Sequence, residues 1–272
     1  MDAGAKTRKT PSRLDAPAQN RSLERGLEIL KAFRPGADVL GNSEIAEKTG
    51  IAKATVSRLT QTLVTAGLLV HDPRARAYRL GAAVLSLALA VRMGNPVLQV
   101  ALPMMRSASD RLRCNVGLAT ADHDEMVYLD SVRYNRKSAL RTVVSGQRVP
   151  IELTSLGRAY LAAVSEDQRQ AFLQRLQARR PAKFALLEQQ IAEAMECVKR
   201  NDYCAAAWQL EVVALSTPLI IPGLPVYVVN MSLSTQEPLP KVVERLRGHL
   251  LALRASILDA MDQNLAETPL PL

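Results

Sequence analysis

The sequence lacks several features that would assign it to well-known classes of protein. Its three cysteines are an odd number without CxxC spacing, which argues against a disulfide framework and indicates a reducing compartment. The N-terminus is polar and basic, without the continuous apolar segment of a signal peptide. The longest apolar run, residues 82–91, is far shorter than the roughly 20 residues that span a bilayer. We therefore expect a soluble, cytoplasmic protein.

The sequence also lacks the residue patterns that carry catalysis or bind metal. Ser155, His123 and Asp124 supply the residue types of a catalytic triad, but there is no GxSxG nucleophile elbow to support it. The histidines and cysteines are scattered without metal-ligand spacing, and no glycine-rich phosphate loop is present. Residues distant in sequence could still converge in space. On sequence alone, we expect neither an enzyme nor a bound metal or cofactor.

Length, hydrophobic content and charge narrow the remaining classes. A chain of 272 residues usually forms about two domains, and 48% hydrophobic residues exclude a wholly disordered adaptor. The net charge is +9, and residues 1–80 hold 14 of the basic and 8 of the acidic residues. This excess suits a surface that neutralises phosphates. A solvated basic tail would give the same count, so charge alone does not decide.

Residues 42–80 have the pattern of a winged helix-turn-helix. Asn42 and Ser43 offer N-caps for a short first helix, and Gly50 supplies the sharp turn that follows it. A second helix is predicted over residues 52–66. The apolar stripe that this helix would bury consists of Val56, Leu59 and Leu63.

Two short strands, residues 68–70 and 77–80, are predicted around a basic turn at residues 71–76. Two helices joined by a tight turn and followed by a basic hairpin form a device that enters the major groove of DNA. The predicted contacts come from the start of the second helix, the hairpin and the preceding helix. They are Lys53, Ala54, Thr55, Ser57, Arg58, Arg74, Arg76 and Arg25.

The segment before this motif consists of an aperiodic tail followed by one predicted helix. Residues 1–20 are polar and basic without periodicity, so we expect a disordered tail; the alternative is an arm for the minor groove. A helix with Ser22 as its N-cap is predicted to pack on the motif. Its apolar positions are Leu23, Leu27, Leu30 and Phe33.

Residues 82–93 are apolar around almost the whole circumference of a helix. A helix without a polar face must be covered on most sides. Between two domains, the simplest cover is the same helix of a second copy, so we predict a dimerisation linker; the alternative is a helix buried within one chain. The predicted domains are residues 21–81, the linker at 82–95, and residues 96–272.

The remainder predicts an α+β domain, a mixed sheet with helices against it. After a helix over residues 97–113, strands are predicted at residues 115–120, 126–132, 139–144, 212–220 and 226–233, with a loop at 146–150. Helices are predicted from Ser155, over 184–200, and at the C-terminal end. The last helix carries Leu239, Val242, Leu246, Leu250, Leu253, Ile257 and Met261 at steps of three and four.

Three segments together resemble the IclR family of bacterial transcriptional regulators. They are SLERGLEILKAF with IAEKTGIAKATVSRLTQTLVTAGLL, then LTSLGRAYLAA, then ALSTPLIIPGLPVYVVNMSLS. The resemblance implies a winged helix-turn-helix domain joined by a linker helix to a GAF-like effector-binding domain. It also implies homodimers or homotetramers, built as pairs of dimers, whose DNA binding is controlled by a carboxylate or an aromatic acid.

The resemblance also implies an effector site. Thr154, Ser155 and Leu156 occupy the helix start whose backbone amides typically hold a carboxylate in this family; a helix N-terminus offers free N–H groups and a positive dipole end. Asn230 and Ser232 match polar positions of the last strand, and a period of two places them on one face.

The chain departs from the family pattern beside this site. The stretch after Tyr203 reads CAAAWQLEVVAL and is short of acidic residues, and Ala214 stands where some members have a pocket cysteine. We hypothesise a more apolar pocket, with Trp208 packing on an effector that has a hydrophobic or aromatic body. The alternative is that Trp208 is a core or interface residue.

The sequence thus predicts a DNA-binding transcriptional regulator controlled by a small metabolite. The alternative is a ligand-sensing interaction or scaffold protein that uses its helix-turn-helix to bind another protein. The exposed cations Lys53, Arg58, Arg74 and Arg76 argue against this alternative, because charged residues are depleted from the core of protein interfaces.

Overall fold

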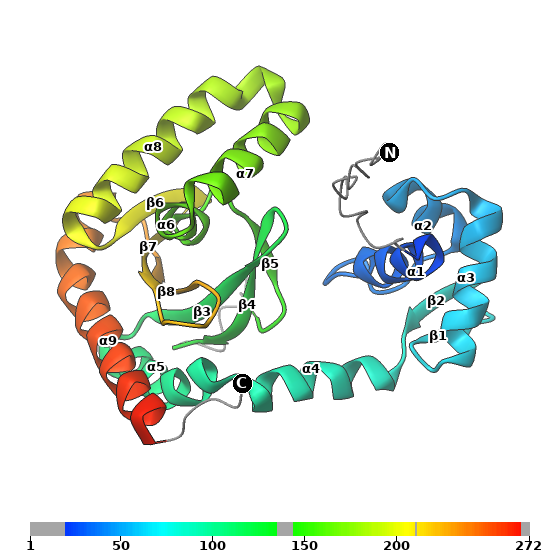
Figure 1. Cartoon of the computed structure of the whole chain (residues 1–272), viewed down its shortest axis with the longest axis horizontal. Helices are drawn as coiled ribbons and strands as arrows, with labels where there is room; N and C mark the ends of the chain where they lie inside the picture. The colour runs from blue at the N-terminus through cyan, green and yellow to red at the C-terminus, as the bar shows by residue number, and fades with distance from the viewer. Residues whose placement is uncertain (1–19, 135–143, 210, 268–272) are drawn as a thin grey trace, which may run out of the picture. The chain divides into compact units, whose positions relative to one another are not determined.

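The computed structural model describes residues 20–134, 144–209 and 211–267 (Figure 1). The chain divides into two compact units, Met1–Ala88 and Leu89–Leu272. We call them the N-terminal and C-terminal units and describe each by itself.

The N-terminal unit is a winged helix-turn-helix, as the sequence predicts. It consists of α1 (Arg21–Ala32), α2 (Asn42–Thr49), α3 (Lys53–Thr65) and a hairpin of β1 (Leu69–Asp72) and β2 (Ala77–Leu80) (Figure 1). The first strand is longer than predicted, since His71 and Asp72 still pair with Tyr78 and Ala77. One hydrophobic core holds these elements together. It contains Ile29, Phe33, Leu40, Ile45, Ile51, Val56, Leu69 and Tyr78.

The predicted N-caps of the first two helices are wrong by one or two positions. Asn20 rather than Ser22 caps α1, because its side-chain oxygen accepts the amides of Ser22 and Leu23 at 3.2 Å each. Gly41 precedes α2, and its amide donates to Glu44 Oε2 at 2.7 Å. The predicted turn at Gly50 is confirmed, with φ of 69°.

The apolar stripe predicted for α1 is also wrong in part. The helix buries Gly26, Ile29 and Phe33, whereas Leu23 and Leu27 are 62% and 49% exposed. The steps of three and four from Gly26 define the buried face. The two leucines lie outside this buried face and do not belong to the core of the unit.

Helix α4 (Ala82–Gly94) follows the hairpin, and the boundary between the two units falls within it. None of its residues is buried. Within the described ranges, no single helix is long and apolar enough to cross a membrane; α4 reaches that apolar length only together with the next helix, from which it is bent by 81°.

The C-terminal unit contains a six-stranded antiparallel sheet in the order β5-β4-β3-β8-β7-β6. The strands are β3 (Asn115–Asp122), β4 (Glu125–Val132), β5 (Arg148–Pro150), β6 (Cys204–Gln209), β7 (Val212–Leu219) and β8 (Tyr227–Ser234). The loop predicted at residues 146–150 is wrong, because Arg148–Pro150 pairs with β4. The strand predicted at 139–144 lies outside the described residues, except for Val144, which is not in a strand.

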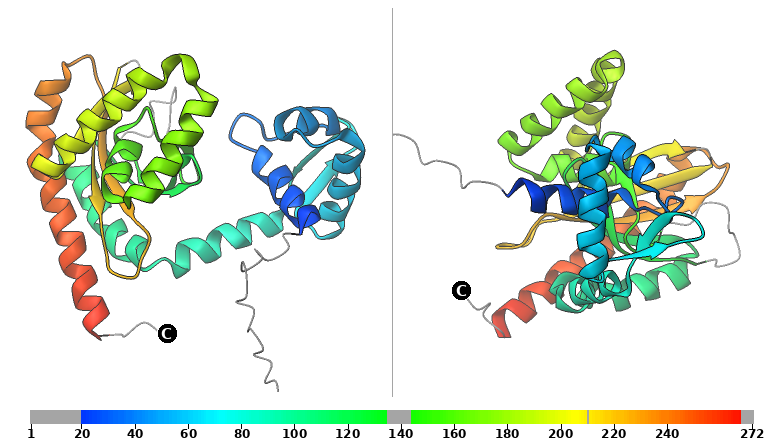
Figure 2. Two further views of the ribbon diagram at one scale, coloured as in Figure 1. Left: turned by 45° about the horizontal axis from the view of Figure 1, so that its top comes forward. Right: turned by 90° about the vertical axis from the view of Figure 1, so that its right-hand side faces the viewer.

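Helices cover both faces of this sheet, so the α+β class is confirmed (Figure 2). The expectation of a mixed sheet is wrong, because every pairing among the described strands is antiparallel. One face packs on α5 (Pro96–Leu112) and α9 (Leu239–Glu267). The other packs on α6 (Ser155–Ala163), α7 (Glu166–Arg179) and α8 (Phe184–Asn201), which a short 3-10 turn (Pro181–Lys183) precedes. Six of the seven core positions predicted for α9 are confirmed, since Val242, Leu246, Leu250, Leu253, Ile257 and Met261 are all buried. Leu239 is half-buried and packs against the same core.

Alternation along the strands separates the residues of the two faces. In β8, Tyr227, Val229 and Met231 belong to the core formed with α5 and α9, whereas Val228 belongs to the core formed with α6 and α8. Asn230 and Ser232 share the parity of Val228. A period of two therefore directs both polar side chains toward the α6 side.

Candidate DNA-binding and effector sites

Helix α3 is held in place by a stripe that is partly polar. Val56 is fully buried and Leu59 and Leu63 are half-buried, as predicted. Thr60 is also fully buried, which the sequence analysis missed. Its hydroxyl donates to the carbonyl of Val56 at 3.0 Å and lies 3.4 Å from Asn42 Oδ1. A threonine can be buried in a helix because the preceding turn satisfies its hydroxyl.

The opposite side of α3 presents the residues predicted to contact DNA. Lys53, Ala54 and Arg58 are exposed, and Thr55 and Ser57 are half-buried. Ala54, Ser57 and Arg58 share one face, because residues three and four apart are neighbours on a helix. Neither Lys53 nor Arg58 makes an ion pair with any residue that the structure describes. Both cations are therefore available to a phosphate or a base edge.

The wing is shaped by Asp72. Its Oδ1 accepts the amides of Arg74 and Ala75 at 3.0 and 3.1 Å. The Ala75 amide lowers the pKa of Asp72 most; the Arg74 amide and the Arg79 charge lower it further and outweigh the opposing effect of burial. This turn leaves Arg74 and Arg76 exposed at the tip, as expected for contacts to a DNA backbone.

Two other basic features lie in the N-terminal unit. Arg25 is exposed on α1, where the sequence predicts a phosphate contact.

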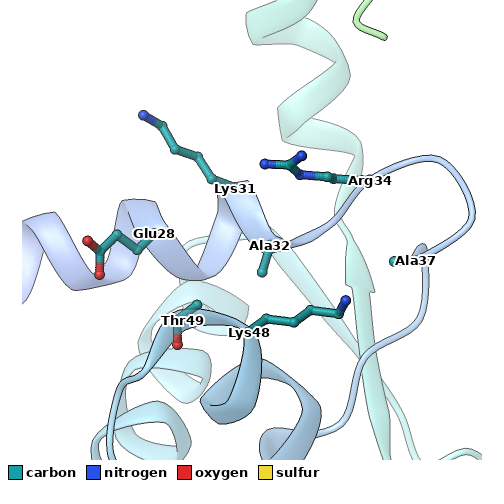
Figure 3. Close-up of a pocket in the computed structure, with 7 residues that line it drawn as sticks. All are labelled: Glu28, Lys31, Ala32, Arg34, Ala37, Lys48 and Thr49. Atoms are coloured by element: carbon teal, nitrogen blue, oxygen red, sulfur yellow. The ribbon is translucent and has the colours of Figure 1, made fainter. Parts of the chain in front are cut away.

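A separate pocket of about 450 Å³ lies between the ends of α1 and α2 (Figure 3). Lys31 and Lys48 in its wall are in the last turns of their helices, where a cation meets the negative end of the helix dipole. The positions of the two lysines at helix ends thus explain why this pocket is basic. The sequence does not predict the pocket itself. It is lined by Glu28, Lys31, Ala32, Arg34, Ala37, Lys48 and Thr49.

The start of α6 has the geometry of an anion site. Thr154 is the N-cap; its Oγ1 accepts the amide of Gly157 at 3.1 Å and donates to the carbonyl of Pro150 at 2.9 Å. Thr154, Ser155 and Leu156 are all buried. Since the first amides of a helix have no partner within it, those of Ser155 and Leu156 remain able to donate to a carboxylate.

Ser155 connects this helix to the sheet. Its hydroxyl lies 2.7 Å from the hydroxyl of Ser216 on β7, and both residues are buried. The thiol of Cys204 donates to the carbonyl of Ser155 at 3.4 Å. Burial raises the pKa of Cys204 to about 12, so this cysteine is a protonated hydrogen-bond donor rather than a reactive thiolate.

Asn230 is a buried polar residue whose side chain is only partly hydrogen-bonded. It is only 3% exposed, and its Nδ2 donates to the hydroxyl of Tyr128 at 3.4 Å. Its Oδ1 has no hydrogen-bond partner in the described part of the chain. Burial raises the pKa of Tyr128 far above its usual value, so the phenol stays neutral. A buried acceptor without a donor is costly, which marks this position as one that a ligand could satisfy.

Strand pairing places two of the remaining predicted residues, Ala214 and Ser232, near Asn230. Ser216 pairs with Asn230 and Ala214 pairs with Ser232, and residues directly opposite each other share a face. Trp208 is half-buried and packs against the core on the α6 side of the sheet, next to a bulge in β6. The site residues predicted from the sequence thus gather on one side of the sheet.

The sequence does not predict three residues that lie beside these positions, namely Ser216, Tyr128 and Gly117. Ser216 could have been found, because it lies two residues after Ala214 on a predicted strand. Gly117 is opposite Asn230, and a Cβ there would lie 2.6 Å from Asn230 Oδ1 and 2.5 Å from the Tyr128 ring. Neither Gly117 nor Tyr128 carries a signal in the sequence, since strand pairing alone brings them to Asn230.

The residue types of a catalytic triad do not assemble. Ser155 contacts Ser216. Asp124 accepts from Arg175 and Arg179 at 2.9 and 3.2 Å, and His123 lies 2.7 Å from its neighbour Asp122. Over the described ranges, no group of three or more histidine, cysteine and acidic residues is arranged to hold a metal ion.

Comparison with known proteins identifies both units. Residues 22–73 match the IclR helix-turn-helix domain, and residues 90–219 match the bacterial transcriptional regulator IclR C-terminal domain. The crystal structure of an IclR family transcriptional regulator from Brucella abortus is 31% identical, with a TM-score of 0.82, over 93% of this chain and 96% of that one.

Two further proteins are similar to this chain. The HTH-type transcriptional regulator TsaQ1/TsaQ2 of Comamonas testosteroni is 40% identical over 158 residues, which are 56% of each chain; the chain thus spans about half the length of this curated relative. An IclR homolog from Microbacterium hydrocarbonoxydans, solved in complex with 4-hydroxybenzoate, shares the fold with a TM-score of 0.64 at 21% identity over 88% of this chain and 99% of that one. The chain belongs to the IclR family of bacterial transcriptional regulators.

Proposed function

We propose that the protein is a sequence-specific transcriptional regulator that binds double-stranded DNA in the cytoplasm and has no catalytic activity. The observation that carries this proposal is the exposed start of α3, where Lys53 and Arg58 have no ion-pair partner in the described residues. The exposed Arg74 and Arg76 of the wing extend this basic surface. A recognition helix contacts bases with such residues, while a wing contacts the backbone.

The test is recovery of genomic DNA fragments by the purified full-length protein at two salt concentrations, followed by sequencing. We expect a discrete, roughly palindromic site, and the genes beside it would indicate the class of effector. Recovery of all fragments alike, lost at the higher salt concentration, would indicate backbone binding without sequence specificity. Absence of any recovery would favour the alternative in which the helix-turn-helix binds another protein.

The effector is a carboxylic acid with a hydrophobic or aromatic body that binds between α6 and the sheet. The buried amides at the start of α6 suit its carboxylate. Trp208, Ala214 and Ser232 are placed to contact the hydrophobic or aromatic body of the effector. The unpaired Oδ1 of Asn230 favours an effector that also carries a hydroxyl group. If only small hydrophilic acids such as two-carbon oxoacids bound, the aromatic part of this proposal would be wrong.

Replacing Asn230 with leucine should remove the preference for a hydroxylated effector. The wild-type protein should bind 4-hydroxybenzoate at least about fivefold more tightly than benzoate, since a hydrogen bond to a buried acceptor contributes about 1 kcal/mol or more. In Asn230→Leu the two affinities should become similar. Isothermal titration calorimetry with both acids measures the difference. Ser234→Ala, at the exposed end of the same strand, is the control; an unchanged preference in Asn230→Leu would argue against this role.

The protein forms dimers through α4, which separates a DNA-binding domain at residues 21–81 from an effector domain at 96–272. Leu85, Leu87, Leu89, Val91 and Met93 are each more than half exposed. An apolar surface of this kind is unfavourable in water unless a partner covers it. Pairs of dimers would form through other surfaces.

Charges placed on α4 should therefore weaken the dimer. The variant Leu85→Glu/Leu89→Glu puts two carboxylates one turn apart on the same face. Sedimentation velocity should show mostly monomers for it and dimers or larger species for the wild-type protein. Glu substitutions of the exposed Ser43 and Gln61 control for added charge. A variant that remained dimeric would show that α4 is not the dimer contact.

A further inference from the structure

Arg92 is the single charged residue of α4, and its hydrogen bonds connect the end of this helix to the sheet of the C-terminal unit. Its guanidinium makes three hydrogen bonds to two segments of the C-terminal unit. Nη1 donates to the carbonyl of Leu129 at 3.2 Å and to the hydroxyl of Ser145 at 3.0 Å, and Nη2 donates to Asp130 Oδ2 at 2.8 Å. The backbone carbonyl of Arg92 accepts from Gln99 of α5 at 2.7 Å. The end of α4 is thus fixed from two sides.

Asp130 is a buried anion that is built to receive this guanidinium. It is 9% exposed, and its second oxygen accepts from the Ser131 amide at 2.7 Å and from the Ser145 hydroxyl at 2.9 Å. Burial by itself raises the pKa of Asp130, but the hydrogen bonds from Arg92, Ser145 and Ser131 outweigh it and hold the pKa below its usual value. Asp130 is therefore ionised at neutral pH, and hydrogen bonds from a guanidinium to a carboxylate are stronger than neutral ones.

The same strand reaches the effector site two residues earlier. Tyr128 faces Asn230 with its hydroxyl, and its backbone carbonyl and amide bond to Gly146 and Gln147 at 2.7 and 3.0 Å. Ser145, adjacent to these residues, contacts both Arg92 and Asp130. A path of hydrogen bonds and adjoining backbone therefore leads from Asn230 through Tyr128 and the 145–147 segment to the last turn of α4.

We propose that Arg92 is the positioning residue that transmits occupancy of the effector site to α4. A ligand at Asn230 that displaces Tyr128 shifts β4 and the 145–147 segment, and Arg92 converts that shift into a new direction for α4. The inference rests on the proposed function, because α4 leads to the DNA-binding unit. It requires that the ligand favour one of two arrangements of this path, since only differential affinity shifts an equilibrium.

The path can be tested without knowing the effector. In Gly117→Ala, a new Cβ lies 2.5 Å from the Tyr128 ring and 2.6 Å from Asn230 Oδ1, so both side chains must move. We expect this variant to change the affinity of the full-length protein for its operator by between roughly twofold and a hundredfold, in either direction. In an Arg92→Ala background, the same substitution should change operator affinity by much less. Fluorescence anisotropy with the recovered operator measures all four proteins of this cycle.

Two further measurements keep the outcomes distinct. Tyr128→Phe, which removes the hydroxyl near Asn230 without adding an atom, repeats the cycle if Gly117→Ala fails to fold. Hydrogen exchange of the α4 amides reads the same coupling without DNA, so a failure to bind any operator would count against the proposed function alone. Arg106→Ala, at an exposed arginine of α5, is the matched control. Equal effects of Gly117→Ala with and without Arg92, or no effect in either background, would overturn the proposal.

Discussion

Replacing Arg58 with alanine should strongly weaken sequence-specific operator binding. Arg58 is exposed on the face of α3 that also presents Ala54 and Ser57, and it has no ion pair to break within the described residues. An arginine that reads a guanine edge through two hydrogen bonds contributes about 1–3 kcal/mol of discrimination. The loss should therefore be roughly fivefold to over a hundredfold in operator affinity, with little change for unrelated DNA.

Fluorescence anisotropy with operator and scrambled DNA at several salt concentrations measures this effect. Arg74→Ala in the wing is the matched control, because a phosphate contact weakens all sequences together and reduces the salt slope by about 1. Near-normal operator affinity in Arg58→Ala would remove Arg58 from the residues that contact bases.

Replacing Gly157 with alanine should destabilise the C-terminal unit by about 3 kcal/mol. A Cβ at this position would lie 2.2 Å from both the Cα and the carbonyl oxygen of Ile151. Both obstacles are backbone atoms of a fully buried residue, so neither can rotate away as a flexible side chain would. The start of α6 must therefore move away from the turn at Ile151 that precedes it.

Denaturant unfolding monitored by circular dichroism measures this loss. Gly248→Ala in α9 is the control, because Gly248 is exposed and has open space around it; an alanine inside a helix is more stable than glycine by about 0.5–1 kcal/mol. The two glycines should thus respond with opposite signs. A wild-type unfolding midpoint for Gly157→Ala would show that the Ile151 backbone adapts without cost.

The features that the sequence predicts well are those encoded by neighbouring residues. Gly50 predicts a turn because glycine readily adopts the left-handed conformation found there. The buried face of α9 is predicted by apolar residues at steps of three and four. The sequence places the N-cap of α1 two positions too late, because Asn20 and Ser22 are both good capping residues. The choice follows from which face of α1 is buried, and Gly26 and Ile29 rather than Leu23 define it.

The features that the sequence could not predict depend on pairing between distant segments. Tyr128 meets Asn230 only because β4, β3 and β8 are adjacent in the sheet. Arg92 meets Asp130 across 38 positions of the chain, and neither residue type distinguishes this pair from a surface ion pair. The β6 strand was missed because CAAAWQ is rich in alanine, which has a low strand propensity.

The exposed apolar surface of α4 has a consequence for how steeply genes would respond to the amount of this protein. A palindromic operator offers two half-sites one helical turn apart, and two copies of the reading helix must bind together. If α4 joins the two copies, monomers predominate when the protein is scarce. The concentration of dimers then rises with the square of the protein concentration. Occupancy of the operator would therefore rise from low to high over a narrow range of protein concentration. Dimerisation through α4 would in this way make transcription respond more steeply than the amount of protein.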